Sequence, residues 1–446
     1  MILKAIKSAA LTCAAACLML NPAKANGLIR DAEIERTMQS AARPLLQNAG
    51  LPITSTNILI VNDRSMNAFV AGGNNVFINA GLVMRLKSVE MLQAVIAHEI
   101  GHITGGHVSQ RAAARASANS ATGIGIILGL IAAAAGDARA GAAVVFGSTD
   151  AVRKSILSNT RSQEASADQS GARYMAAAGI DPAAAIEVLD LFRGQELLSV
   201  RNIDPYAQTH PMSSERISRL RGYVAAYRPK ESAQAPDIDY WYARTSAKFR
   251  GFLDTPKSTL KRYPTSDDSE AALLARAIAY HRLPDPAKAS ATIDRLIGMR
   301  PGDAFYHELK GQFLLESGKA APAVTSYRKA ADLAPDEPLI HSGLGRALLA
   351  TDTAANNKAA LEILKKSYSR DSRDAMTLYN LALAYARDGQ AGIASVITAE
   401  RYALASDFKQ ATIHAERAKQ VLPQGTGGWL RADDIVIAAK RINDGK

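Results

Sequence analysis

The octapeptide VIAHEIGH, residues 95–102, constrains this 446-residue chain more tightly than any other segment. Its His98, Glu99 and His102 form an HExxH pattern, and on a helix the residues i and i+4 lie on one face. Both imidazoles can therefore reach one metal ion at about 2.0–2.1 Å. Glu99 lies beside that face, where it can take a proton from an attacking water. The apolar residues around the motif predict a buried helix, in which a His-Glu-His set needs a partner.

A third metal ligand has to come from another part of the chain. Metzincins place a histidine six residues after the second motif histidine, but that residue is Val108, and His107 is out of register by one. Both cysteines lie within the N-terminal leader described below, so a carboxylate has to serve. In TRSQEASAD, residues 160–168, Glu164 can complete a His-His-Glu set, and Asp168 can orient a ligand histidine. Acids at i and i+4 also occur on ordinary surface helices, so the spacing alone leaves both readings open.

Three motifs together resemble a known family: HEIGHxxxxH, then ExxxD in a helix, then an HP…R element made by His210, Pro211 and Arg216. They look like the gluzincin peptidases of family M48, which include HtpX and the CAAX prenyl endopeptidases. An N-terminal leader followed by tetratricopeptide repeats is similar to the periplasmic BepA-type branch. The resemblance covers essentially the whole mature chain. It implies endopeptidase activity and one Zn²⁺ per chain, with Glu164 as the third ligand.

The same resemblance gives roles to residues that spacing alone does not single out. The segment 67–79 resembles an edge strand that pairs with the substrate backbone by β-addition. His210 matches a site residue that either stabilises the tetrahedral oxyanion or occupies a fourth zinc position and keeps the enzyme latent. Arg216 is expected to belong to the same catalytic set.

Residues 1–25 are expected to be a secretory signal. They have a positive start, an apolar core at residues 8–20 and a small-x-small cleavage site at Ala23-Lys24-Ala25. The 13-residue core is short for a membrane span, which needs about 20 residues. Neither cysteine has the bulky aliphatic residue three positions earlier that lipidation requires. Cleavage after Ala25 would leave an exported chain without cysteine, for which the periplasm of a Gram-negative bacterium fits best.

The composition excludes several classes of protein. With 48% hydrophobic and 21% charged residues, the chain is neither disordered nor a polytopic membrane protein. The leader holds three lysines and no acid, which leaves +8 of the total net charge of +11. No run of Lys and Arg accompanies that charge, so we expect no nucleic-acid partner.

The C-terminal part repeats with a period of 34 residues, the length of a tetratricopeptide repeat. Ala277, Gly311 and Gly345 share the position where two helices pack closely, and a proline ends successive second helices. The register slips by a few residues at 354–357, in a predicted turn. Such arrays stack into a concave surface that binds peptides or partner proteins.

We therefore expect a mostly helical α+β protein: a zincin-like metallopeptidase domain with a small strand region, followed by an all-α tetratricopeptide solenoid. Short strands are predicted at 57–62 and 75–79, and helices from Leu82 onward. The predicted organisation is a signal peptide at 1–25, a metallopeptidase domain at 26–230, a linker with leading helices at 231–269, repeats at 270–423 and a C-terminal helix or cap at 424–446.

An apolar, glycine-rich hairpin at residues 122–147 separates the motif helix from Glu164. Asp137 and Arg139 interrupt it, and its apolar run is too short to span a bilayer. We favour a helical lid over the active site; the alternative is an element that contacts the membrane surface.

Two functions are consistent with these sequence features. The first is a zinc endopeptidase that cleaves misfolded or stalled envelope proteins while its repeats dock partners. The family resemblance suggests outer-membrane β-barrel precursors and their assembly machinery, and unpaired strand edges in such precursors suit strand addition. The second is a periplasmic chaperone or assembly scaffold that acts mainly through the repeats. The intact HExxH motif and Glu164 favour catalysis.

Overall fold

The computed structural model describes residues 27–107, 109–110, 160–194, 204–211, 213–229 and 234–444. The predicted signal peptide and the hairpin at 122–147 lie outside these residues. Among the helices that the structure describes, none combines the length and the apolar character that crossing a membrane requires.

The N-terminal half contains one four-stranded sheet. Its order is β1 (Leu28–Ile29), β2 (Asn57–Val61), β4 (Asn75–Asn79) and β3 (Ala68–Ala71). β2 and β4 are parallel, whereas β1 and β3 run antiparallel to their neighbours. β2 and β4 are the two predicted strands, and β3 forms one edge of the sheet.

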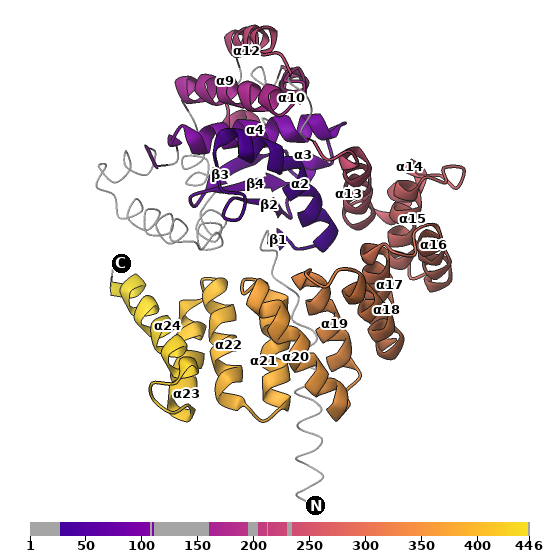
Figure 1. Cartoon of the computed structure of the whole chain (residues 1–446), viewed down its shortest axis with the longest axis vertical. Helices are drawn as coiled ribbons and strands as arrows, with labels where there is room; N and C mark the ends of the chain where they lie inside the picture. The colour runs from indigo at the N-terminus through magenta and orange to yellow at the C-terminus, as the bar shows by residue number, and fades with distance from the viewer. Residues whose placement is uncertain are drawn as a thin grey trace, which may run out of the picture.

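Helices cover the sheet in two layers. α2 (Ala32–Ala49) and α4 (Val89–Thr104) pack on the strands, after the short α3 (Ala80–Val83). Figure 1 shows α9 (Arg161–Ala177) stacked on α4, on the side away from the sheet. The outer layer is completed by α10 (Ala184–Asp190), α11 (Pro205–Thr209) and α12 (Ser214–Ala226). The helix that carries the HExxH motif is therefore central and buried, as its apolar residues predict.

Two glycines let α4 and α9 approach closely. A Cβ on Gly101 would lie 2.7 Å from the backbone oxygen of Ala167, and one on Gly171 would lie 3.2 Å from the backbone of Ala97. A larger residue at Gly101 would push the helices apart. α9 begins at a capping box, in which Thr160 and Gln163 exchange side-chain and backbone hydrogen bonds. Together these features fix the start of α9 beside the motif.

The C-terminal half is an array of antiparallel helix pairs that curves beneath the N-terminal half (Figure 1). Equivalent helices start 34 residues apart in the first three pairs, as predicted. Gly311 and Gly345 are the close-packing positions: added Cβ atoms would lie 2.6 Å from Tyr327 and 2.4 Å from Leu364. The helices are α15 (Glu270–Arg282), α16 (Pro286–Met299), α17 (Ala304–Glu316), α18 (Ala320–Leu333), α19 (Pro338–Ala350), α20 (Ala354–Arg370), α21 (Ala375–Arg387), α22 (Ala391–Leu404), α23 (Phe408–Val421) and α24 (Gly427–Asp444).

The register slip lies in a helix, not in the predicted turn. α20 begins 34 residues after α18 and is therefore still in phase, but it has 17 residues where α18 has 14. The three additional residues lengthen α20 and displace every later helix start. The asparagines at 356 and 357, typical of turns, lie in the first turn of this helix, where Thr353 accepts a hydrogen bond from Asn356 N.

α13 (Ile238–Leu253) joins the two halves and is followed by α14 (Pro256–Arg262). The Tyr242 hydroxyl donates to the carbonyls of Val83 and Leu86, at 3.3 Å each, which anchors α13 to the N-terminal half. On its other side α13 packs against α15.

The helix α13 also carries a buried ion network that we call the domain junction. Lys248 Nζ lies 2.7 Å from Asp31 and 3.3 Å from Glu33, and Arg244 Nε lies 2.6 Å from Glu33. Arg244 also pairs with Asp303 at the start of α17. Both cations are at most 2% exposed, so the junction ties the first residues of α2 to the repeats.

Arg30 adds a second tie outside the domain junction. It pairs with Glu35 at 2.5 Å, with Asp371 at 2.5 Å and with Asp374 at 3.5 Å. The two aspartates lie between α20 and α21. Arg30, two residues before α2, is therefore bound to the loop that leads into the fourth helix pair of the array.

Candidate active site

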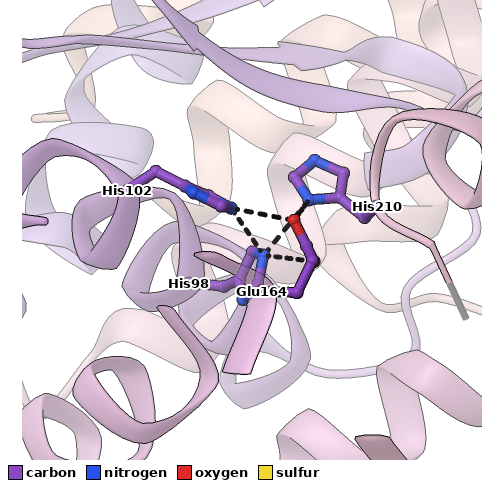
Figure 2. Close-up of side chains that lie close together, drawn as sticks. All are labelled: His98, His102, Glu164 and His210. Atoms are coloured by element: carbon purple, nitrogen blue, oxygen red, sulfur yellow. Dashed lines mark hydrogen bonds and ion pairs between the residues drawn. The ribbon is translucent and has the colours of Figure 1, made fainter. Parts of the chain in front are cut away.

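The motif helix and α9 bring three predicted ligands to one point (Figure 2). Nε2 of His98 and Nε2 of His102 lie 3.1 Å apart. Glu164 presents Oε2 at 3.4 Å from the first nitrogen and Oε1 at 3.3 Å from the second. With His210, the donor atoms of these residues all lie within 4.8 Å of one another, and all four side chains are buried.

The far nitrogens of both motif histidines are bound by other side chains. His98 Nδ1 lies 2.9 Å from Asp168 Oδ1, and His102 Nδ1 lies 2.8 Å from His107 Nδ1. An Nδ1–H that donates to each partner leaves the lone pair of Nε2 directed at the centre of the cluster. Two lone pairs at 3.1 Å cannot hydrogen-bond to each other, so a proton or a metal ion has to lie between them.

His210 follows α11 and reaches the same centre. Its Nδ1 lies 3.0 Å from Glu164 Oε1 and 3.2 Å from His98 Nε2. Its Nε2 lies 3.2 Å from the carbonyl of Ala68, the first residue of the edge strand β3. Tyr206 stacks on the ring with the centroids 4.4 Å apart. An Nε2–H that donates to Ala68 leaves Nδ1 as a fourth possible ligand atom.

Glu99 lies next to the cluster. It is fully buried, and its Oε1 lies 3.4 Å from His210 Nε2. A carboxylate beside the ligand atoms, rather than among them, is the arrangement that the HExxH spacing predicts.

Arg216, in the first turn of α12, binds the carboxylates of Glu164 and Asp168. Its Nη1 lies 2.7 Å from Glu164 Oε2, and its Nε lies 2.7 Å from Asp168 Oδ2. It also donates to the carbonyl of His210 at 3.4 Å. The structure thus brings all seven predicted site residues together, with Arg216 touching acids and backbone.

The electrostatics of the cluster favour ionised carboxylates. Burial alone would raise the pKa of Glu164, but His210 and Arg216 outweigh it and hold that pKa well below its usual value. Asp168 is likewise buried, and Arg216 and His98 lower its pKa to about 2. Burial, aided by His98 and His210, lowers the pKa of His102. Ionised carboxylates and a neutral imidazole are the forms that bind a metal.

His98 behaves differently from His102. Burial would lower the pKa of His98, but hydrogen bonds to Asp168 and Glu164 outweigh it and raise this pKa to about 10. A proton therefore competes with a metal ion at His98.

The donor set fits a metal ion. A tetrahedral centre with bonds of about 2.0–2.1 Å separates its ligand atoms by about 3.3–3.4 Å. The distances among His98 Nε2, His102 Nε2 and the Glu164 oxygens are 3.1–3.4 Å. His98, His102 and Glu164 would hold the metal, and His210 Nδ1, 3.0 Å from Glu164 and 3.2 Å from His98, is a candidate for a fourth ligand atom.

Two further residues contact the site although no role was predicted for either. His107 is the last histidine of the HEIGHxxxxH motif; it is 4% exposed and contacts His102. The sequence feature that could have indicated its position is the pair of glycines before it. Gly106 has φ +64°, and a Cβ on Gly105 would lie 2.5 Å from the His107 ring. Tyr206, which stacks on His210, has no comparable signal.

Comparison with known proteins gives relatives that are named as proteases. The β-barrel assembly-enhancing protease of Escherichia coli K12 is 26% identical over 420 residues, covering 94% of this chain and 85% of the relative. That of Yersinia pestis is 24% identical, with the same shares covered. Among solved structures, the crystal structure of MamA is 18% identical, with a TM-score of 0.30 over 38% of this chain and 94% of MamA; that score is too low to inform fold or function. Residues 29–224 match the model of peptidase family M48, and they form a metallopeptidase domain of that family.

Proposed function

We propose that this protein is a zinc endopeptidase of the bacterial envelope that cleaves misfolded or stalled envelope proteins. The observation that carries the proposal is the convergence of His98 Nε2, His102 Nε2 and the Glu164 carboxylate at 3.1–3.4 Å, with Glu99 buried beside them. Nitrogen and carboxylate ligands without thiolates fit zinc, and a His₂Glu set is a known catalytic arrangement.

When bound, zinc lowers the pKa of a water to about 7 and polarises the scissile carbonyl. Glu99 takes the proton of the attacking water and delivers it to the leaving amine. Asp168 holds His98 by Nδ1, which keeps Nε2 available as a ligand. Arg216 positions the site: its guanidinium holds Glu164 and Asp168 ionised and in place.

The edge strand β3 supports a peptide substrate. Among the described residues β3 is the edge strand of the sheet, where an added strand would pair, and it lies next to the proposed metal ligands through the contact between Ala68 and His210. Binding through the main chain would accept many sequences, provided that the substrate segment is unfolded.

Of the two roles for His210, we propose the fourth-ligand role. Its Nδ1 lies at ligand distance from the cluster, and its Nε2 is bound to the Ala68 carbonyl of β3. In this arrangement His210 occupies the position that the attacking water needs, so the resting enzyme is latent. An incoming strand on β3 would compete for the same carbonyl and release His210.

The names of the relatives suggest the biological setting. The protein that is 26% identical is called a β-barrel assembly-enhancing protease. We propose a periplasmic enzyme, exported by the leader at 1–25, that acts on outer-membrane β-barrel precursors. Its helical repeats would dock substrates or the assembly machinery.

The test uses residues 26–446 and a Glu99→Gln version of the same chain. We expect one zinc in both proteins by elemental analysis, and casein cleavage only in the parent. Loss of Glu99 should slow cleavage by about 10²–10⁴-fold. If both bind zinc and neither cleaves, His210→Ala should switch cleavage on.

Two outcomes would count against the proposal. Persistent inactivity of the His210→Ala protein would favour a scaffold that acts through the repeats. A chain that binds no zinc would exclude the metallopeptidase mechanism.

A further inference from the structure

A basic cavity lies on the side of the N-terminal half where α13 and α14 join it, in the region of α3, α13 and α14 in Figure 1. Its volume is about 560 Å³. Its charged lining consists of five cations and one acid: Arg64, Arg85, Lys87, Arg250, Arg262 and Asp254. None of these residues belongs to the active site.

The positive charge of this cavity exceeds what the described residues neutralise. Asp254 is shared by Arg64 and Arg250, each at 3.5 Å. Within the part of the chain that the structure describes, Arg85, Lys87 and Arg262 form no ion pair. The cavity thus carries an excess of about four positive charges, and a concave surface concentrates such a field. Like charges placed together cost free energy unless an anion joins them.

The cavity wall is held in place by backbone contacts. A Cβ on Gly81 would lie 2.0 Å from the carbonyl of Arg64, and Gly81 N donates to the Asp63 carbonyl at 2.9 Å. These contacts fix the loop after β2. Arg250 is half-buried and donates to the Met84 carbonyl, which fixes the turn after α3. Two walls are therefore set before any ligand arrives.

We propose that this cavity binds a ligand carrying phosphate groups. A single carboxylate would satisfy one guanidinium and leave the remaining cations together. A phosphate monoester carries about −1.5 to −2 charges, so two phosphate groups match the excess. The planar guanidinium forks of the arginines suit phosphate oxygens. The volume lies in the range of small-molecule sites, about 300–1,000 Å³, and exceeds the needs of one phosphate ion.

The test measures binding of inorganic pyrophosphate to residues 26–446 by calorimetry. Arg85→Glu combined with Lys87→Glu reverses two exposed cations of the cavity. The matched control reverses one exposed arginine and one exposed lysine elsewhere, Arg43→Glu with Lys329→Glu. We expect at least tenfold weaker binding for the cavity variant and none of this loss for the control. Arg262→Glu is a second cavity variant, and circular dichroism checks the fold of each.

Two further arms separate the sources of phosphate. Binding to a lipid headgroup is tested with phosphatidylcholine vesicles in which about one lipid in five is phosphatidic acid. Vesicles of phosphatidylcholine alone are the control. Pyrophosphate binding without vesicle binding indicates a soluble phosphate compound, and cavity-dependent vesicle binding indicates a headgroup. A heptaglutamate peptide tests an acidic protein segment.

Three results would overturn the proposal. They are no binding of either phosphate probe, equal binding by the cavity variants and the parent, and tighter binding of the peptide than of pyrophosphate. Pyrophosphate that binds at the metal centre contributes equally to parent, variants and control, so the comparison removes it. The outcome does not depend on peptidase activity.

Discussion

The active site and the domain junction are both buried clusters of charged side chains, but they differ in what completes them. At the domain junction, Lys248 and Arg244 each have carboxylates within 3.3 Å. In the active site, two imidazole nitrogens and a carboxylate direct lone pairs at one point. The charges of the first cluster are paired within the chain, whereas the ligand atoms of the second share one position that a proton or a metal ion can occupy.

This difference gives a rule for reading buried charge in this protein. Burial by itself does not mark function, because Lys248 is as buried as the metal ligands. What marks the candidate ligand site is the convergence of two imidazole nitrogens and a carboxylate at 3.1–3.4 Å, where a metal ion can replace the proton of His98. Mutations in the two clusters should therefore have separable effects on metal binding and on stability.

The largest expected effect is the loss of the metal itself. His102→Ala removes one of three proposed ligands, so metal affinity should fall by more than about 100-fold, beyond the effect of outer residues. Elemental analysis after dialysis would show the metal content drop from one per chain towards zero. Retention of a full equivalent would mean that the metal lies elsewhere.

The next effect concerns the domain junction. Arg244→Met leaves the buried Glu33 and Asp303 without their guanidinium, which should lower the free energy of unfolding by about 3–5 kcal/mol. Urea unfolding measures the loss, while zinc content should stay at one per chain. If zinc were lost as well, the two clusters would not be independent.

A smaller effect on metal affinity is expected for the residues that bind the far nitrogens of the ligand histidines. Asp168→Asn keeps the size of the side chain but weakens its hold on His98 Nδ1, so metal affinity should fall by about 10–100-fold. Competition with a fluorescent chelator gives the affinity. His107→Gln is a second test on the other ligand. If the metal affinity were unchanged in both variants, Asp168 and His107 would have packing roles only.

The smallest effect is a pH dependence near the domain junction. Burial raises the pKa of Glu308 to about 8, with Lys248 opposing this rise. A raised acid pKa means that the folded state binds the proton more tightly than the unfolded state. Its contribution to stability is therefore full below about pH 4.3, near the unfolded pKa, and is lost as the pH rises towards 8.

Glu308→Gln removes that titration. Its melting temperature should exceed that of the parent by about 2–4 °C at pH 8.5 and should change less between pH 5 and 8.5. Parallel curves for the two proteins would show that Glu308 does not titrate in this range.

The parts of the site that could be predicted from the sequence are those fixed by helical spacing. His98 and His102 share a face because they are four residues apart, and so do Glu164 and Asp168. His107 could not be placed in the same way, because it follows a glycine turn instead of a helix. The 34-residue period likewise predicted the helix pairs, since each repeat packs on the next.

Features that depend on distant contacts were out of reach. Lys248 lies on α13 in a mixture of charged and aromatic residues that resembles a surface helix, and its partner Glu33 is 215 residues away. β3 has only four residues, too few for a strand pattern, so only the family resemblance of residues 67–79 indicated an edge strand there. That segment contains two strands, of which β3 is at the edge and β4 is interior. The longer α20 was misplaced into a turn because two asparagines at its start are as typical of turns as of first helical turns.

The tie made by Arg30 has a consequence for the order of assembly. Its partners Asp371 and Asp374 lie 341 and 344 residues further along the chain. Because a chain is made from its N-terminus, Arg30 exists long before the fourth helix pair. This contact therefore forms only after the third helix pair has been made, and closing so long a loop is slow compared with forming local contacts. Until then, Glu35 is the acid near in sequence with which Arg30 can pair.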